Sequence, residues 1–181
     1  MSERAMPVVR VRRPTFNQSS RNGVKPQLIV LHSTEGTNVT GLGDLTGLGS
    51  WFATKSAQVS SHVATDAEGN SARFVADGDK AWHCARYNSL SLGIEQVGKA
   101  AQTSWAEAQQ RETARWMAYW SRLHGIPLQK GAVANGVVTR PGVLRHSELG
   151  PLGGGHSDPG RDYPLHEVLD LARHYRKLQS T

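Results

Sequence analysis

The chain has 181 residues, 38% of them hydrophobic, which suits one domain with a substantial core. Its single cysteine, Cys84, excludes an internal disulfide, and no apolar run approaches the ~20 residues that cross a bilayer, so no membrane insertion is expected. The formal net charge is +6, but only +1 of it falls after residue 25, so the main part of the chain is nearly neutral and no nucleic-acid partner is expected.

Residues 1–25, "MSERAMPVVRVRRPTFNQSSRNGVK", form a basic segment that lacks the apolar stretch of a secretory signal. We expect a basic, partly flexible N-terminal arm here, followed by one folded domain over residues 26–181. Two interpretations of the arm stay open. It is either a solvated chain terminus or a segment that attracts a polyanion.

The first regular element is a buried strand at "PQLIVLH", residues 26–32, which ends at His32. A glycine-rich segment follows, but it lacks the Lys and the spacing of a nucleotide loop, and it leads to a short helix predicted at "WFATKSA", residues 51–57. Residues 60–78 then predict two strands joined by a turn at "DAEGN", and "LSLGIEQVG", residues 90–98, predicts another strand.

Two helices complete the pattern. The first is predicted over residues 104–125, where Ser104 and Glu107 make a capping box and Gly125 ends the helix. Its apolar face contains Trp105, Ala108, Trp116, Met117, Trp120 and Leu123. The second helix is predicted over residues 163–179, with Leu165, Val168, Leu169, Ala172 and Tyr175 facing the core. Strands interspersed with helices predict an α/β domain, a mixed central sheet flanked by helices.

The segment "RHSELGPLGGGHSDPG", residues 145–160, is too polar for a core and combines possible metal ligands with a flexible glycine run. Hydrolytic zinc sites take three protein ligands and leave a position for water. His146 and Asp158 are candidate ligands from this segment, and His32 can arrive from the first predicted strand. Spacing alone makes this a weak prediction, because loop histidines are common.

Five segments of the sequence strengthen the prediction of a zinc site. They are "LIVLHST", "VSSHVATDAEGN", "KAWHCARYNSLSLGIEQVG", "RHSELG" and "HSDPGRDYP". In this order they resemble the zinc-dependent N-acetylmuramoyl-L-alanine amidases, the superfamily of peptidoglycan recognition proteins and phage endolysin amidases. The resemblance covers residues 27–174 and implies a single domain of that fold. It also implies hydrolysis of the amide between N-acetylmuramic acid and L-alanine in peptidoglycan.

Carried over by position, the resemblance implies that His32, His146 and Asp158 bind one zinc ion. Glu95 falls where the family has a carboxylate that acts on the zinc-bound water. His156 falls where many relatives have lysine, and its implied role is donation to the developing oxyanion. The substrate groove is implied to include Trp82, His83 and Asn88, whereas His62 is expected to be structural.

Three functional hypotheses remain at this point. We expect a monomeric bacteriophage endolysin that waits in the host cytoplasm and reaches the cell wall through a membrane lesion. The alternatives are a bacterial amidase for wall recycling or remodelling, and a peptidoglycan-binding module without catalysis. The full set of ligands and Glu95 favours an enzyme over the module.

Overall fold

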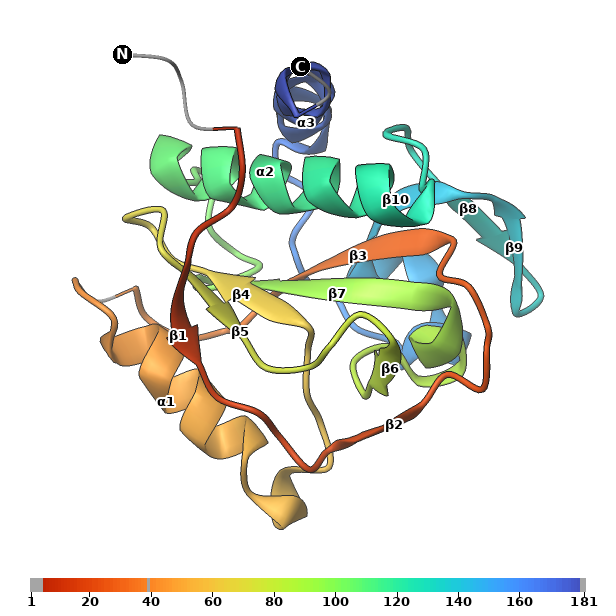
Figure 1. Cartoon of the computed structure of the whole chain (residues 1–181), viewed down its shortest axis with the longest axis horizontal. Helices are drawn as coiled ribbons and strands as arrows, with labels where there is room; N and C mark the ends of the chain where they lie inside the picture. Colours follow the sequence, from red (N-terminus) through yellow and green to blue (C-terminus); the bar gives the residue numbers. More distant parts are fainter. Residues whose placement is uncertain (1–4, 39, 180–181) are drawn as a thin grey trace.

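A computed structural model describes residues 5–38 and 40–179. Its centre is a six-stranded mixed sheet with the strand order β1-β5-β4-β7-β3-β10 (Figure 1). The strands are β1 (Val9–Arg12), β5 (Ser71–Arg73), β4 (Val63–Thr65), β7 (Ser91–Gln96), β3 (Leu28–Ser33) and β10 (Gly142–Arg145). Within this sheet, only β4 and β5 pair antiparallel, as the hairpin predicted around "DAEGN". The predicted α/β architecture with a mixed sheet is therefore confirmed.

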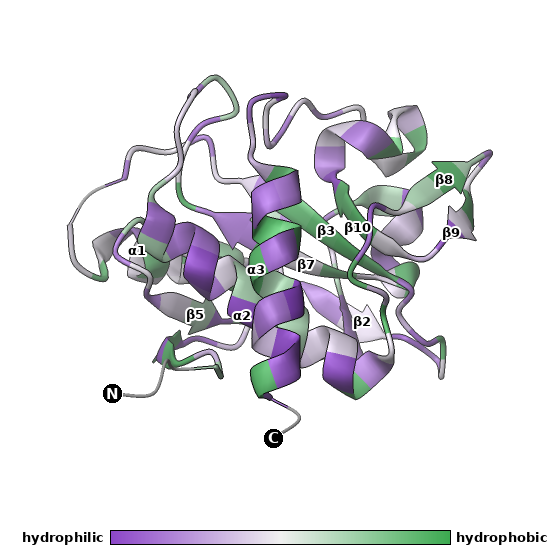
Figure 2. Ribbon diagram, turned by 90° about the horizontal axis from the view of Figure 1, so that it is seen from above, coloured by the Kyte–Doolittle hydropathy of each residue, from purple (hydrophilic) through white to green (hydrophobic). Residues whose placement is uncertain are grey.

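Helices cover both faces of this sheet. Helices α2 (Glu107–His124) and α3 (Leu165–Leu178) cross on one face, and α1 (Gly43–Phe52) covers part of the other (Figure 1). Hydrophobic residues gather on β3 and β10, while α3 alternates between hydrophilic and hydrophobic positions (Figure 2). Among the described residues, none of the helices combines the length and the apolar character needed to cross a membrane.

Side chains alternate along the central strands, and this alternation decides which residues lie on each face of the sheet. On β3, Ile29 and Leu31 pack into the cluster that contains α2 and α3, whereas Leu28 and Val30 pack on the opposite face. His32 follows the parity of Leu28 and Val30, so its side chain emerges on the face opposite α2 and α3. This parity places the first candidate ligand on the side where the cavity described below lies.

The short elements complete the fold. Strands β2 (Gln18–Ser20) and β6 (Asp79–Ala81) form a two-stranded ribbon, as do β8 (Ala132–Ala134) and β9 (Val137–Arg140). Four 3-10 turns occur in the described chain, at Lys55–Ala57, Ala85–Leu90, His146–Leu149 and Pro151–Gly153.

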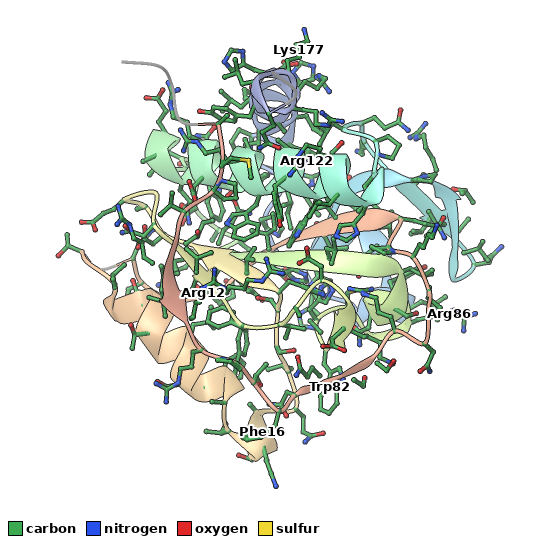
Figure 3. The ribbon with its side chains drawn as sticks, in the orientation of Figure 1. Arg12, Phe16, Trp82, Arg86, Arg122 and Lys177 are labelled. Atoms are coloured by element: carbon green, nitrogen blue, oxygen red, sulfur yellow. The ribbon has the colours of Figure 1, made fainter. Side chains whose placement is uncertain are left out.

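The described part of the basic arm runs along the domain. It supplies β1 to the central sheet and β2 to the ribbon, with Arg12 extending from β1 (Figure 3). Arg21 is buried and donates to the carbonyl oxygens of Asp77, Ser89 and Ser91 at 2.9, 2.7 and 2.7 Å. Residues 1–4 lie outside the described chain, and the boundary between residues 25 and 26 stays a prediction.

Two predicted elements were wrong in detail. The helix expected over residues 51–57 lies earlier, because α1 occupies the glycine-rich segment and ends at Phe52. Packing overrides the low helix propensity there: Leu45 and Phe52 are buried against Phe74, and a Cβ at Gly49 would lie 2.9 Å from that ring. The predicted capping box is also absent, because α2 begins at Glu107 after an N-cap, Ala106, that has no side-chain hydrogen bond.

The apolar face predicted for α2 is partly confirmed. Trp105, Trp116, Met117 and Trp120 are buried, whereas Ala108 and Leu123 are exposed. Ala114 and Ala118 are buried in the same cluster, although they were not predicted as part of this face. The inward face predicted for α3 is confirmed, since Val168, Leu169, Ala172 and Tyr175 are buried and Leu165 packs against the same cluster.

Candidate metal centre

Three of the predicted site residues meet at one edge of the sheet. β3 and β10 are parallel neighbours with Leu31 opposite Arg145, so their carboxyl ends bring His32 and His146 together. Asp158 comes from the loop that precedes α3, and its backbone carbonyl accepts from the amide of Ser147 at 2.8 Å. All three side chains are buried, and each offers one ligand atom within 4.8 Å of the others.

The atoms of this cluster face one another directly. His32 Nδ1 lies 3.0 Å from His146 Nδ1 and 3.4 Å from Asp158 Oδ2, and His146 Nδ1 lies 3.2 Å from Asp158 Oδ1. His146 Nε2 lies 2.8 Å from the carbonyl oxygen of Gly153, so Nε2 carries a proton that it donates there. In the neutral imidazole, Nδ1 then presents a lone pair to the cluster.

The surroundings of His32 and Asp158 set the charge state of each side chain. Burial lowers the pKa of His32 to about 4, so this imidazole is neutral at pH 7. Burial alone would raise the pKa of Asp158, but its close contacts with His146 and His32 outweigh burial and lower that pKa, so the carboxylate is ionised. Two imidazole nitrogens and one carboxylate in a buried cluster fit a zinc ion with an open coordination position.

Glu95 lies beside the cluster. It pairs with His32 in the register of β7 and β3. Its Oε2 is buried without a hydrogen-bond partner among the described residues. Burial, followed by the nearby charges of Asp158 and Glu35, raises the pKa of Glu95 to about 8. A carboxyl group with a pKa near neutrality can accept and return a proton, which is what a general acid and base requires.

His156 covers the cluster from the solvent side. Its ring stacks on that of His146 with centroids 4.3 Å apart and 18° between the planes, and its side chain is 58% exposed. The glycine run makes this arrangement possible. Gly154 has φ = 110°, and a Cβ there would lie 2.9 Å from the His156 ring. The run therefore carries the chain between the two histidines and supplies the Gly153 carbonyl.

A cavity of about 410 Å³ opens onto these groups. Its lining includes every residue predicted for the site: His32, Trp82, His83, Asn88, Glu95, His146, His156 and Asp158. Trp82 lies beside β2, where its Nε1 donates to Ser19 Oγ at 3.1 Å (Figure 3). Asn88 Oδ1 accepts from the backbone amides of His83 and Cys84 at 2.9 and 2.7 Å, so it holds the loop that carries them.

Sequence reasoning missed several residues of the cavity wall, among them Trp51 and Glu35. Trp51 lies on α1, lines the cavity and is 53% exposed. Sequence reasoning placed Trp51 at the first position of a helix and assigned it no part in the site. Glu35 Oε1 accepts from Ser33 Oγ at 2.6 Å and from the Ala100 amide at 2.8 Å, at the cavity wall. Its position three residues after His32 was the available signal.

His62 and Cys84 are buried close to the cavity. His62 Nδ1 accepts from the backbone amide of Gly93 at 2.9 Å, which is the structural use expected for this histidine. Burial raises the pKa of the Cys84 thiol to about 12, which keeps it protonated and poorly nucleophilic.

Comparisons with known proteins point to one family. A family model described as N-acetylmuramoyl-L-alanine amidase matches residues 22–161. The chain is similar to N-acetylmuramoyl-L-alanine amidase A of Achromobacter lyticus, with 29% identity over 150 residues that cover 79% of this chain and 81% of that protein.

The fold is also that of several solved structures. Hydrolase AmiA of Staphylococcus aureus, determined with its ligand, superposes with a TM-score of 0.73 at 19% identity, covering 97% of this chain and 86% of that one. The endolysin amidase LysCS of Clostridium intestinale superposes with a TM-score of 0.62 at 16% identity, covering 90% and 93%.

Proposed function

The chain belongs to the N-acetylmuramoyl-L-alanine amidase family, and on this premise we propose that it is a zinc-dependent member whose metal ion is bound by His32, His146 and Asp158. The enzyme class and its peptidoglycan substrate follow from the family. The single observation that carries the zinc proposal is the buried cluster of two imidazole nitrogens and an ionised carboxylate beside the unpartnered oxygen of Glu95.

Zinc bound there supplies a Lewis acid that makes water more acidic and polarises a carbonyl group. Glu95 Oε2 takes the proton from the attacking water and then gives it to the nitrogen of the leaving amine. His156 donates to the carbonyl oxygen as that oxygen becomes negative. The bond between the carbonyl carbon and nitrogen breaks, leaving a carboxylate on the lactyl group and a free amine on L-alanine.

The cavity accommodates the substrate around these groups. We propose that Trp82, His83 and Asn88 contribute to its wall, with the aromatic face of Trp82 against sugar or peptide. Trp51 adds a second aromatic surface from α1 on the same cavity. A cavity of this size, lined by aromatic side chains together with a few polar groups, is typical of a binding site for part of a larger substrate.

For the biological role we propose a monomeric bacteriophage endolysin that reaches the wall from the host cytoplasm through a membrane lesion. The fold shared with a solved endolysin amidase supports this role, and the alternative is a bacterial recycling or remodelling amidase. Lysis of intact walls supports the endolysin, whereas cleavage confined to soluble muropeptides supports recycling. Family membership argues against a binding module without catalysis.

The zinc proposal is tested by metal analysis together with the loss of turbidity of purified cell walls. Wild type should contain one zinc ion, lose lysis on chelation and recover it when zinc is returned. Glu95→Ala should retain zinc and lose most activity, because Glu95 is not a ligand. His166→Ala, at an exposed position on α3, is the matched control. A fully active Glu95→Ala would remove the proposed base, and a metal-free one would make Glu95 a ligand.

A further inference from the structure

His83 contacts His32, the first candidate ligand, at the ring nitrogen that does not face His146. Its Nδ1 lies 2.9 Å from His32 Nε2, and its Nε2 lies 3.1 Å from Ser91 Oγ. The ring rests on β7 at Gly93, where a Cβ would lie 2.7 Å from His83 Nδ1. A glycine at this position therefore lets the ring approach both His32 and Ser91.

The hydrogen bonds indicate which ring nitrogen of His83, and then of His32, carries the proton. Ser91 Oγ donates its one hydrogen to the carbonyl oxygen of Tyr87 at 2.8 Å. It can therefore only accept from His83, so His83 carries its proton on Nε2. His83 Nδ1 then has a lone pair and accepts. The hydrogen in its contact with His32 is therefore carried and donated by His32 Nε2. A neutral His32 with its proton on Nε2 has a bare Nδ1.

The same logic applied independently to His146, through the Gly153 carbonyl, leaves its Nδ1 bare as well. The 3.0 Å contact between His32 Nδ1 and His146 Nδ1 is therefore a contact of two acceptors. Asp158 adds a third acceptor. With no hydrogen among them, a cation is the partner that these three groups share.

We propose that His83, itself held by Ser91, is a positioning residue that fixes the tautomer of His32 and thereby sets the affinity of the cluster for its divalent metal ion. The inference rests on the proposed zinc function. It also changes the role predicted for His83. Both ring nitrogens are engaged inside the protein, so the substrate can meet only the carbon atoms of the ring.

The test is the zinc affinity of metal-free protein, measured by competition with a chromophoric chelator. His83→Leu removes the acceptor for His32 and should weaken zinc binding about 10–100-fold, the range seen when such supporting partners are lost. His83→Asn places an amide oxygen near the position of Nδ1 and should recover most of that loss. Gly93→Ala keeps every polar group but pushes the ring away, and it should also weaken binding.

Two further readouts separate positioning from general damage to the fold. Nitrogen-15 spectra of histidine-labelled, metal-free wild type should show the proton of His32 on Nε2. The cobalt-substituted protein should show a visible spectrum that changes in His83→Leu and returns toward wild type in His83→Asn. His166→Leu is the matched control for losing a histidine, and its zinc affinity should equal that of wild type.

The outcomes distinguish the inference from the function on which it rests. If wild type binds no zinc, the proposed function fails. If wild type binds zinc and His83→Leu binds it equally well, or if His32 carries its proton on Nδ1, the inference is wrong while the zinc function stands. If His83→Leu does not fold, the comparison of Gly93→Ala and His83→Asn with wild type decides.

Discussion

Replacing the carboxyl group of Glu95 with an amide should stabilise the metal-free protein, and the gain should grow with pH. The folded-state pKa of Glu95 is raised from 4.5 to about 8, chiefly by burial. The folded protein therefore prefers the protonated carboxyl. The stability this contributes is fully present below about pH 4.5 and is lost as the pH rises through 8. Glu95→Gln keeps the shape of the protonated group and cannot ionise.

The difference in pKa sets the size of the effect. A change from 4.5 to about 8 corresponds to a ceiling of roughly 5 kcal/mol in the free energy of unfolding. Because Glu95 lines the cavity, water screens part of this penalty, and we expect a gain of about 2–3 kcal/mol at pH 8 and above. At pH 4.5 the two proteins should differ by less than about 0.5 kcal/mol.

The assay is urea unfolding of chelator-treated wild type and Glu95→Gln at several pH values between 4.5 and 9. Glu167→Gln, an exposed position on α3, is the control for losing a carboxylate, and its effect should not vary strongly over this range. Returning zinc should shrink the gain of Glu95→Gln, because a nearby cation favours the ionised carboxylate. A difference between Glu95→Gln and wild type that does not change with pH would refute the reasoning.

Three further outcomes are expected. Gly160→Ala should lower both stability and zinc affinity, because its Cβ would lie 1.8 Å from the Ala100 carbonyl oxygen and displace the loop of Asp158. The control is Gly47→Ala on α1, whose Cβ meets no atom within 4 Å, and thermal unfolding should show that it is tolerated. Removing zinc present at a thousandfold excess over its Kd should cost about 4 kcal/mol, or roughly 10 °C in Tm by calorimetry. Arg21→Met should cost about 2–4 kcal/mol in urea unfolding, because it strands buried carbonyl groups; an unchanged midpoint would mean that the arm is not anchored there.

The elements that the sequence predicted well are those whose pattern is local. Residues 26–32 form an apolar, β-branched run and residues 90–98 alternate in character, and both segments are central strands. Helix α3 was predicted within about two residues at its start because its apolar stripe is regular. These are segments in which the local preference and the tertiary packing agree.

The elements that were missed depend on partners far away in the chain. Strand β1 exists because Val9 and Val11 lie beside β5, more than fifty residues later. Strand β10 is four residues long and reads as part of a loop until β3 pairs with it. The helix in the glycine-rich segment is likewise stabilised by contacts with Phe74. No local pattern contains these contacts, so sequence reasoning could not place them.

The candidate site, too, could be predicted from the sequence only in part. The family resemblance indicated His32, His146 and Asp158, but it could not indicate which nitrogen of each ring carries the proton. That depends on Ser91 and Gly153, neither of which has a side chain or a motif that suggests metal chemistry. The supporting residues become visible only when the hydrogen bonds are followed outward from the ligands.

The alternation of β7 connects the fold to the chemistry. Leu92 and Ile94 face α2 and α3 and are held by the core. The intervening positions, Ser91, Gly93 and Glu95, therefore share the opposite face, where they respectively hold His83, make room for its ring and supply the proposed base. Because the period is two residues, a register shift of one would bury Glu95 against α2 and turn Ile94 toward the candidate metal ligands. Through this one strand, the apolar core thus fixes the position of the carboxylate that we propose as the base and of the groups that we propose set the tautomer of His32.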